Sequence, residues 1–327
     1  GEPVSAEETL RAAREQGDDE NLVAVPLARA YYRQRKMDAL FTDFRPDRLA
    51  PDARADLLML QGSVRLENRR YEDARNLFLD ARALRPADPD PLVALANLHL
   101  ALGEIDEARR LLDEALTLDP RSERALYTVA ELHQQRGEHA KALEYYEKAI
   151  AAAPEYFDAR AGKATVLIEL GQANTAMALL EELRGDSPYD PKVPYLQALA
   201  ALRTGDPKVA DTYMAEAEGV LDALPRDFVV DHGPILLLSG VVSFTRGNWE
   251  DAQTYLDRYV ELYPNHAASR RLLGTILLQK GETTRAVRLL EYARRLAPND
   301  HRVLSLLGQA YLAENERSEE RRVGKEC

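Results

Sequence analysis

The chain has 327 residues and a formal net charge of −12, because 55 aspartates and glutamates outnumber 43 lysines and arginines. This acidic balance argues against a nucleic-acid partner, which needs a clustered basic surface. The sequence also contains no run of about 18 apolar residues, so it predicts no membrane-spanning helix.

Residues 1–54 predict partial or degenerate repeats at the N-terminus. Ala6, Leu10 and Ala13 have the small-large-small spacing of the second helix of a helical hairpin. The chain opens on Gly1 and not on a methionine, so we expect upstream sequence to be missing. A membrane anchor in that upstream segment stays open as an alternative.

Residues 21–54 predict one degenerate unit. Leu27, Ala28 and Tyr31 have the spacing of a first helix. A short helix is then expected from Met37 to Phe44. It is followed by a proline-containing connector at Arg45–Pro51, with Asp52 as the cap of the next helix.

From residue 55 onward the sequence has a fixed period of 34 residues, which is typical of stacked repeats. A proline closes each unit because it lacks an N–H group and clashes with the preceding helical turn. A glycine ends the first helix of each unit because it accepts a left-handed backbone. The prolines are Pro86, Pro120, Pro154, Pro188, Pro264 and Pro298, and the glycines are Gly103, Gly137, Gly171, Gly205, Gly247 and Gly281.

Small residues recur in phase with these stops. Ala96 with Ala108, and Ala130 with Ala142, are expected where paired helices cross, since a larger side chain would push the helices apart. The sequence therefore predicts an all-α solenoid of helical hairpins. Its parts are partial repeats at 1–54, an array at 55–222, an insertion at 223–232, an array with an incomplete last repeat at 233–316, and a non-native tail at 317–327.

The insertion is expected to be a lengthened second helix followed by a loop. The tail reads RSEERRVGKEC and is similar to the translation of a short-read sequencing adapter; a charged, solvated helix is the alternative. Without the tail the net charge becomes −13 and the single cysteine, Cys327, is lost. The hairpin that begins with Leu304 and Gly308 then has no second helix, so its apolar face is expected to be exposed.

The small residue in the first helix, the two alanines in the second and the terminal proline, all in register, resemble the tetratricopeptide repeat (TPR) family. The resemblance covers nearly the whole chain. It implies a right-handed α-solenoid whose first helices line a concave groove. It also implies a non-catalytic protein that binds a protein or peptide segment in that groove.

Two stretches carry a further resemblance. MDALFTDFRPDRLAPDARADLLMLQGSVRL at Met37–Leu66, and the stretch from Gly240 to Glu291, are similar to the TPR-repeat lipoproteins of bacterial PEP-CTERM/exosortase systems. Those proteins are encoded with exopolysaccharide machinery and are thought to act as envelope scaffolds. The resemblance implies a periplasmic or envelope location. A docking or regulatory region of a larger enzyme such as a glycosyltransferase, or a cytoplasmic assembly adaptor, are the alternatives.

The sequence shows no catalytic or cofactor-binding motif: it has no phosphate-binding loop, no His-Glu-x-x-His and no Gly-x-Ser-x-Gly. We therefore expect no enzyme, no cofactor and no metal. His99 and His133 occupy equivalent positions of adjacent repeats and are expected to pack against the turn, since repeat spacing keeps them roughly 10 Å apart. Paired carboxylates such as Asp106 and Glu107 are expected to favour helix starts.

Groove-facing candidates are first-helix residues on the side away from the second helix. The stretch from Tyr195 to Phe244 is apolar and predicts an interface, unless the insertion folds over it. A clamp for a C-terminal carboxylate is not expected, since only Asn97 matches the family's clamp residues and Glu131 repels a carboxylate. The candidates are Asn97, Tyr127, Glu131, Tyr195, Leu199, Leu202, Leu237, Val241, Phe244 and Arg271.

Overall fold

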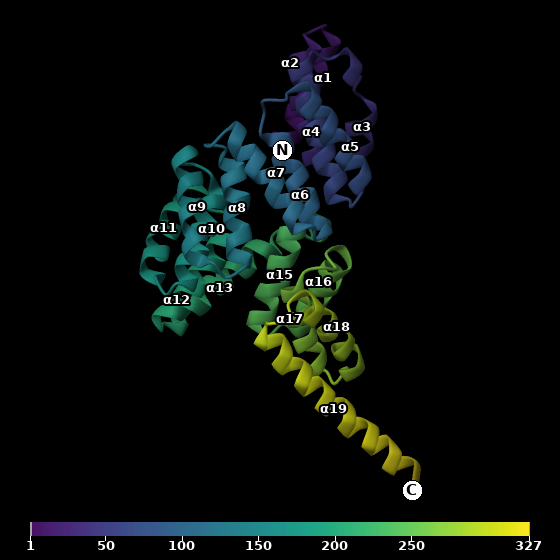
Figure 1. Cartoon of the computed structure of the whole chain (residues 1–327), viewed down its shortest axis with the longest axis vertical. Coiled ribbons are helices and arrows are strands. Elements are labelled where there is room, and N and C mark those ends of the chain that lie inside the picture. Colours follow the sequence, from purple (N-terminus) through teal and green to yellow (C-terminus); the bar gives the residue numbers. More distant parts are fainter. Residues whose placement is uncertain (1, 327) are drawn as a thin grey trace. The chain divides into compact units, whose positions relative to one another are not determined.

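A computed structural model describes the backbone of residues 2–326 and the side chains of residues 4–315. The all-α prediction is confirmed, because every regular element of residues 2–326 is a helix (Figure 1). The chain divides into two compact units, Gly1–Val166 and Leu167–Cys327, which are described separately. No helix within residues 2–326 is both long enough and apolar enough to cross a membrane.

The first unit is a row of antiparallel helices joined by short turns. In each hairpin the first helix is called helix A and the second helix B. α10 begins in this unit and ends beyond its boundary. The helices are α1 (Glu2–Glu15), α2 (Glu20–Arg33), α3 (Met37–Thr42), the 3-10 turn η1 (Pro46–Arg48), α4 (Pro51–Glu67), α5 (Tyr71–Leu84), α6 (Asp90–Leu102), α7 (Ile105–Leu118), α8 (Glu123–Gln135), α9 (His139–Ala152) and α10 (Phe157–Glu169).

The second unit repeats the arrangement with one interruption. Helices α12 and α13, α15 and α16, and α17 and α18 pair as hairpins, and α19 packs against α17 and α18. The helices are α11 (Ala173–Asp186), α12 (Lys192–Thr204), α13 (Pro207–Asp222), α14 (Arg226–Asp231), α15 (Gly233–Arg246), α16 (Trp249–Leu262), α17 (Ala267–Gln279), α18 (Thr283–Leu296) and α19 (His301–Glu326).

The turn glycines adopt the left-handed backbone that the sequence predicts. The six predicted glycines all have φ between 72° and 82°. A Cβ built on Gly103 meets nothing within 4 Å, so the backbone conformation, and not lack of space, requires glycine there. Arg35 and Arg69 lie 68 and 34 residues before Gly103 and also have positive φ, of 59° and 58°. The period therefore extends into the degenerate N-terminal unit.

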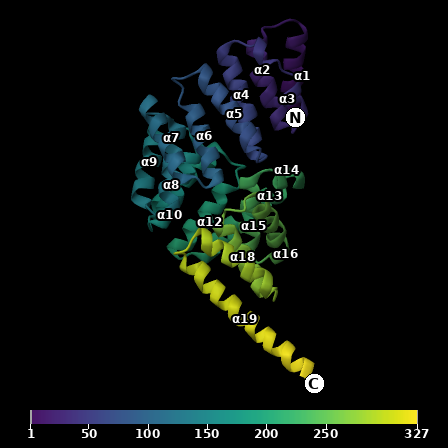
Figure 2. The same cartoon turned by 45° about the vertical axis from the view of Figure 1, so that its right-hand side comes forward.

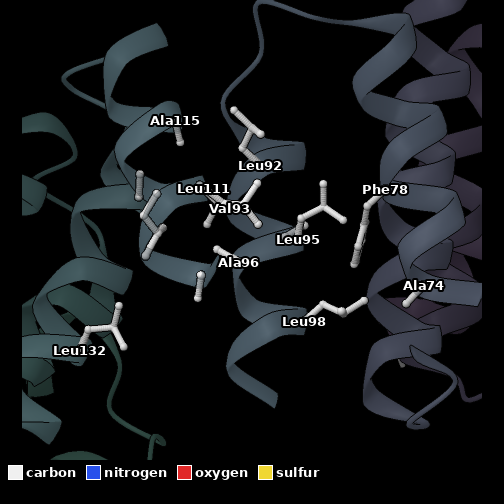
Figure 3. Packing of buried hydrophobic residues seen from close by; sticks show 14 residues of the cluster. Ala74, Phe78, Leu92, Val93, Leu95, Ala96, Leu98, Leu111, Ala115 and Leu132 are labelled. Atoms are coloured by element: carbon white, nitrogen blue, oxygen red, sulfur yellow. The ribbon is translucent and has the colours of Figure 1, made fainter. Parts of the chain in front are cut away.

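Close contact between helix A and helix B holds each hairpin together. In the hairpin of α4 and α5, a Cβ on Gly62 would overlap the ring of Phe78, which is fully buried. One repeat later the same two positions hold Ala96 and Leu112, both fully buried. In each pair a small residue of helix A leaves room for one large side chain of helix B. Figure 3 shows Phe78 next to Leu95 and Leu98 of α6, so each hairpin also buries a seam against the next.

A polar cluster ties α1 to the turn after α2. The carboxylate of Glu7 is buried, with a residue exposure of 4%. It accepts hydrogen bonds from Lys36 Nζ at 2.5 Å and Gln34 Nε2 at 2.7 Å. The hydrogen bond from Lys36 holds the pKa of Glu7 below its usual value. α1 is therefore fixed on α2 by charge-assisted bonds as well as by Leu10, which packs on the same apolar cluster.

The structure differs from the sequence prediction at three places. Asp52 is not the cap of α4, because Ala50 holds that position and Pro51 starts the helix with its fixed φ. The short helix ends at Thr42 and is followed by a 3-10 turn. The predicted loop of the insertion contains α14, because Val229 is buried against Leu236 and Tyr259 of the next hairpin.

The C-terminal helix is longer than any other. α19 runs without a break from His301 to Glu326. The predicted non-native tail therefore continues the helix as far as Glu326, while its side chains and Cys327 lie outside the described residues. α13 has 16 residues where its counterparts α16 and α18 have 14, which agrees with the predicted lengthening before the insertion.

Contact between Gly62 and Phe78 predicts a compensating pair of substitutions. We expect Gly62→Ala to lower the free energy of unfolding by about 1–3 kcal/mol, because the buried ring has no room to move. Adding Phe78→Leu recreates the pair seen at Ala96 and Leu112, so the double variant is expected to be more stable than the sum of the single effects. Urea unfolding of the four proteins measures this coupling, and additive losses would contradict it.

The turn conformation predicts opposite signs for two glycine substitutions. Gly103→Ala is expected to lower stability by about 1 kcal/mol, since alanine resists positive φ. Gly219, in the helical part of α13, also has open space around its Cβ position. Gly219→Ala is therefore the matched control and is expected to raise stability by up to about 1 kcal/mol. Thermal unfolding followed by circular dichroism tests both signs, and equal effects would refute the explanation.

Candidate functional site

The apolar helix A surface of the second unit lies on α12 and α15. Tyr195 and Leu199 of α12 and Val241 of α15 are partly exposed, and Leu202 at the end of α12 is 50% exposed. The helix beneath them is fixed because Ala198 of α12 is fully buried in a cluster with Met214 of α13, and Tyr195 packs against this same cluster. The four side chains thus remain accessible while the backbone beneath them is fixed.

A cavity of about 220 Å³ opens beside Leu202. It lies where the period breaks, since the turn glycines Gly205 and Gly247 are 42 residues apart and not 34. The cavity is lined by Leu202, Pro207, Ala210, Asp211, Met214, Thr245 and Arg246.

One wall of this cavity carries an ion-pair network. Arg246 at the end of α15 pairs with Asp211 and with Glu218 of α13, the latter at 3.1 Å from Nε to Oε2. Asn248 Nδ2 donates to the other oxygen of Glu218 at 2.6 Å. Arg246 is already paired with two carboxylates, so the polar rim of the cavity is fixed. The floor is formed by the apolar lining residues. The cavity is suited to a buried apolar side chain of a partner.

The insertion covers only part of the apolar surface. α14 packs on α15 through Val229, and Leu237 is partly buried in this same cluster. Figure 2 shows α14 as a short helix near α13 and α15. Phe244 packs on the cluster of α16 and α17, and its ring meets Trp249 edge to face at 5.3 Å. Leu237 and Phe244 therefore belong largely to the seams between hairpins. Leu199 and Leu202 are outside these two clusters, which leaves them the better candidates for a partner.

Arg271 of α17 is a candidate of different chemistry. Burial lowers the pKa of its guanidinium, while nearby Asp300 favours the charge. No other described residue forms an ion pair or hydrogen bond with its guanidinium. A partly buried cation of this kind can bind a carboxylate of a partner with little loss of side-chain freedom.

The start of α17, which carries Arg271, depends on a histidine cap. His266 Nδ1 accepts a hydrogen bond from the backbone N–H of Ser269 at 3.2 Å. Its ring lies edge to face with Tyr259 at 5.3 Å. Burial lowers the pKa of His266 below its usual value. The neutral ring is therefore the form that the folded state prefers.

The candidates of the first unit are polar and satisfy one another. Tyr127 OH donates to Glu131 Oε1 at 2.7 Å. The Tyr127 ring lies 5.9 Å from that of Tyr146 and 5.3 Å from that of Tyr156. Burial raises the pKa of Tyr127, and it raises the pKa of Tyr156 to about 12. Asn97 of α6 is partly exposed. The hydrogen bond thus joins Tyr127 and Glu131 to each other.

Sequence analysis missed a second polar site beside this one. Arg124 forms an ion pair with Asp90, with 3.2 Å between Nη1 and Oδ2. Asp90 occupies the position equivalent to Arg124 one repeat earlier. Burial raises the pKa of Asp90, and Arg124 opposes that shift. The sequence signal for this site is that an acidic residue, Asp90, and a basic residue, Arg124, are separated by one period of 34 residues. A cavity of about 490 Å³ at this place is lined by Glu123, Arg124, Ala153, Glu155 and Tyr156.

The equivalent histidines lie at the turns. His99 Nδ1 is 2.5 Å from Glu104 Oε2, and His133 Nδ1 is 3.0 Å from Glu138 Oε2. Each glutamate directly follows a turn glycine. Among the described residues no group of three or more histidine, cysteine or carboxylate side chains is arranged to hold a metal ion.

Comparison with known families supports the repeat assignment. Two models of the tetratricopeptide repeat match the chain, one over residues 64–218 and the other over residues 240–301 and 276–323. Together they cover well over half of the sequence, and α14 lies within the gap between them. The chain belongs to the tetratricopeptide repeat family. The TPR part of the sequence prediction is therefore confirmed. A search of curated proteins gives no match.

Solved TPR structures share the fold. The APC/C hetero-tetramer Cut9-Hcn1 matches with a TM-score of 0.56 and 20% identity over 87% of this chain. The chain spans 55% of that relative. A tetratricopeptide repeat protein from Parabacteroides merdae matches with a TM-score of 0.50 and 18% identity, over 79% of this chain and 98% of that one. At such identities the likeness concerns the fold alone.

The His266 cap predicts a pH dependence of stability. A group whose pKa is lowered by folding stabilises the protein above its unfolded pKa of about 6.5, and that contribution is lost as pH falls through the lower folded value. We expect the thermal midpoint to fall between pH 7.5 and 5.5. His266→Asn keeps an uncharged cap acceptor, so its fall is expected to be smaller. An identical pH profile for both proteins would contradict this role.

Proposed function

We propose that this TPR chain is a non-catalytic scaffold that binds a protein segment along the helix A surface of its second unit. The observation that carries the proposal is the exposed Leu202 beside an apolar-floored cavity on a rigid helix. TPR proteins bind protein or peptide partners, and a fixed, partly exposed apolar surface costs little entropy on binding. The partner chemistry that fits is an extended or helical segment with an apolar anchor residue.

The same surface defines how the partner is oriented. An apolar anchor fits beside Leu202, where Ala210 and Met214 also line the cavity. Arg271 on α17, two hairpins further along the chain, offers a charge to an acidic residue of the partner. Because an anchor and an ion pair act together, apolar burial supplies the affinity and Arg271 supplies the direction of binding.

We also propose a place for this scaffold in a bacterial envelope, within an exopolysaccharide assembly of the PEP-CTERM type. The support is that the sequences of Met37–Leu66 and of the stretch from Gly240 to Glu291 resemble the TPR-repeat lipoproteins of those systems. The proposal stands on that resemblance and on a repeat surface suited to protein segments. Cell fractionation of the native host tests the location, and recovery of the chain with cytoplasmic proteins alone would contradict it.

Peptide selection tests the binding surface. A phage-displayed random peptide library panned against the chain is expected to yield peptides with an apolar anchor. Leu202→Glu and Leu199→Glu are each expected to weaken the selected peptide at least about tenfold, since burying a charge in the anchor site is costly. Fluorescence anisotropy of the labelled peptide measures the affinity.

Val209→Glu provides the matched control. Val209 lies on α13, is 40% exposed and does not line the cavity. It is expected to leave the affinity unchanged. Unchanged binding by both Leu variants, with circular dichroism equal to that of the parent chain, would show that the partner uses another surface.

A further inference from the structure

Two arginines of the second unit lie against one tyrosine ring. The guanidinium carbon of Arg270, in α17, is 4.1 Å from the centre of the Tyr292 ring, and that of Arg295 is 5.0 Å from the same centre. Tyr292 and Arg295 belong to α18, the helix B that pairs with α17 (Figure 1). The ring attracts each cation, but the arrangement also brings two like charges together.

Neither guanidinium has an acidic partner among the described residues. Nε of Arg270 donates to the backbone oxygen of Pro264 at 2.7 Å, and its terminal nitrogens form no further hydrogen bond or ion pair within residues 4–315. Arg295 forms neither kind of contact with a described side chain. Burial lowers the pKa of Arg270; Tyr292 opposes this shift, and the charge of Arg295 adds to it. Arg270 therefore lies in a positive environment.

Other arginines of this unit are neutralised by carboxylates on neighbouring helices. Nη2 of Arg184 is 2.7 Å from Oε1 of Glu216. Arg285 forms ion pairs with Asp257 and with Glu282. A partly buried cation without such a partner loses hydration and gains no ion pair in exchange. By contrast, the two arginines beside the tyrosine keep their donors for a group from outside the chain.

Two of the three side chains are fixed in place. Tyr292 OH donates to Oδ1 of Asn265, in the turn before α17, at 3.1 Å. Arg270 is held through its Nε and is partly buried. At the position of Arg270 the hairpins of α6 and α8 have Leu92 and Leu126, which are both buried. The cation thus stands where the fold elsewhere buries a leucine, and little side-chain freedom remains to be lost on binding.

The surrounding repeat favours an anion. Residues 267–300 hold seven lysines and arginines and three carboxylates, although the whole chain has a net charge of −12. A local excess of positive charge raises the concentration of anions near the surface. Arg295 is exposed, so its side chain can turn toward such an anion.

We propose that Arg270 and Arg295 together bind one oxyanion beside the Tyr292 ring, and that a phosphoryl group is the chemistry that fits. Each guanidinium presents paired N–H donors that match the spacing of phosphate oxygens. A phosphoryl group carries close to two negative charges at neutral pH, which balances two arginines, whereas one carboxylate balances only one. This inference goes beyond the proposed anchor site, since neither arginine lines the cavity beside Leu202.

Titration of the full chain with inorganic phosphate tests the site. The Nε–H signals of the arginines are followed by NMR at constant ionic strength. The signals of Arg270 and Arg295 are expected to shift together, with a dissociation constant of about 1–10 mM. Chloride at the same ionic strength is expected to shift them far less. No phosphate-dependent shift of either signal up to about 50 mM would overturn the proposal.

Arg295→Gln is the sharpest variant, because Arg295 is exposed and its replacement leaves the core intact. Its affinity for phosphate, read at the Arg270 signal, is expected to fall at least about fivefold. Arg294→Gln removes the same charge from the adjacent exposed position, where the arginine acts on Tyr311, and is the matched control that keeps the affinity. Equal affinities of these two variants would overturn the proposal.

The phosphoryl group can come from a free ion or from a phosphorylated segment of a partner. A short phosphoserine peptide and its unphosphorylated form distinguish these sources. Tighter binding of the phosphopeptide than of inorganic phosphate would assign the site to a modified segment, and binding of the ion alone would assign it to free phosphate. Equal binding of both peptides would contradict the phosphoryl chemistry. Leu202→Glu is expected to leave the affinity for phosphate unchanged, so failure of the anchor site and failure of this site are distinguishable.

Discussion

The fold depends on how closely helix A approaches helix B in each hairpin. At the crossing, a glycine or alanine of helix A meets one large side chain of helix B. Gly62 meets Phe78, and Gly274 meets Leu290. Because packed interiors leave little spare volume, the helix A residue at a crossing has to be small. This contact explains why a small residue recurs at this position of each repeat in the sequence.

The crossing also explains why the function is expected at breaks in the period. Where the 34-residue period holds, each hairpin buries the sides that face its neighbours and leaves the outer sides of helix A and helix B accessible. Between Gly205 and Gly247 eight additional residues displace the next hairpin along the sequence. The cavity beside Leu202 is at this place. The cavity is thus lined by residues that precede the insertion and by residues that follow it.

Much of the fold could be predicted because the contact is local and repeated. The turn glycines and the buried Ala108 and Ala142 follow from spacing alone. The cap of α4 could not, since Pro51 and Asp52 both fit a helix start and tertiary contacts select between them. α14 was missed because six residues are too few for a periodic pattern. Its helix is held by Val229, whose burial depends on contacts distant in sequence.

The candidate site was less predictable, because exposure of a helix A residue depends on its neighbours. Sequence spacing placed Leu202 and Phe244 on the same kind of surface, yet Leu202 is exposed and Phe244 packs into a seam. In the first unit, Tyr127 and Glu131 bond to each other, which no spacing rule revealed. The two units therefore offer different chemistry. The polar surface favours selectivity through hydrogen bonds, and the apolar surface favours affinity through burial, so one partner that used both would need a polar segment and a separate apolar anchor.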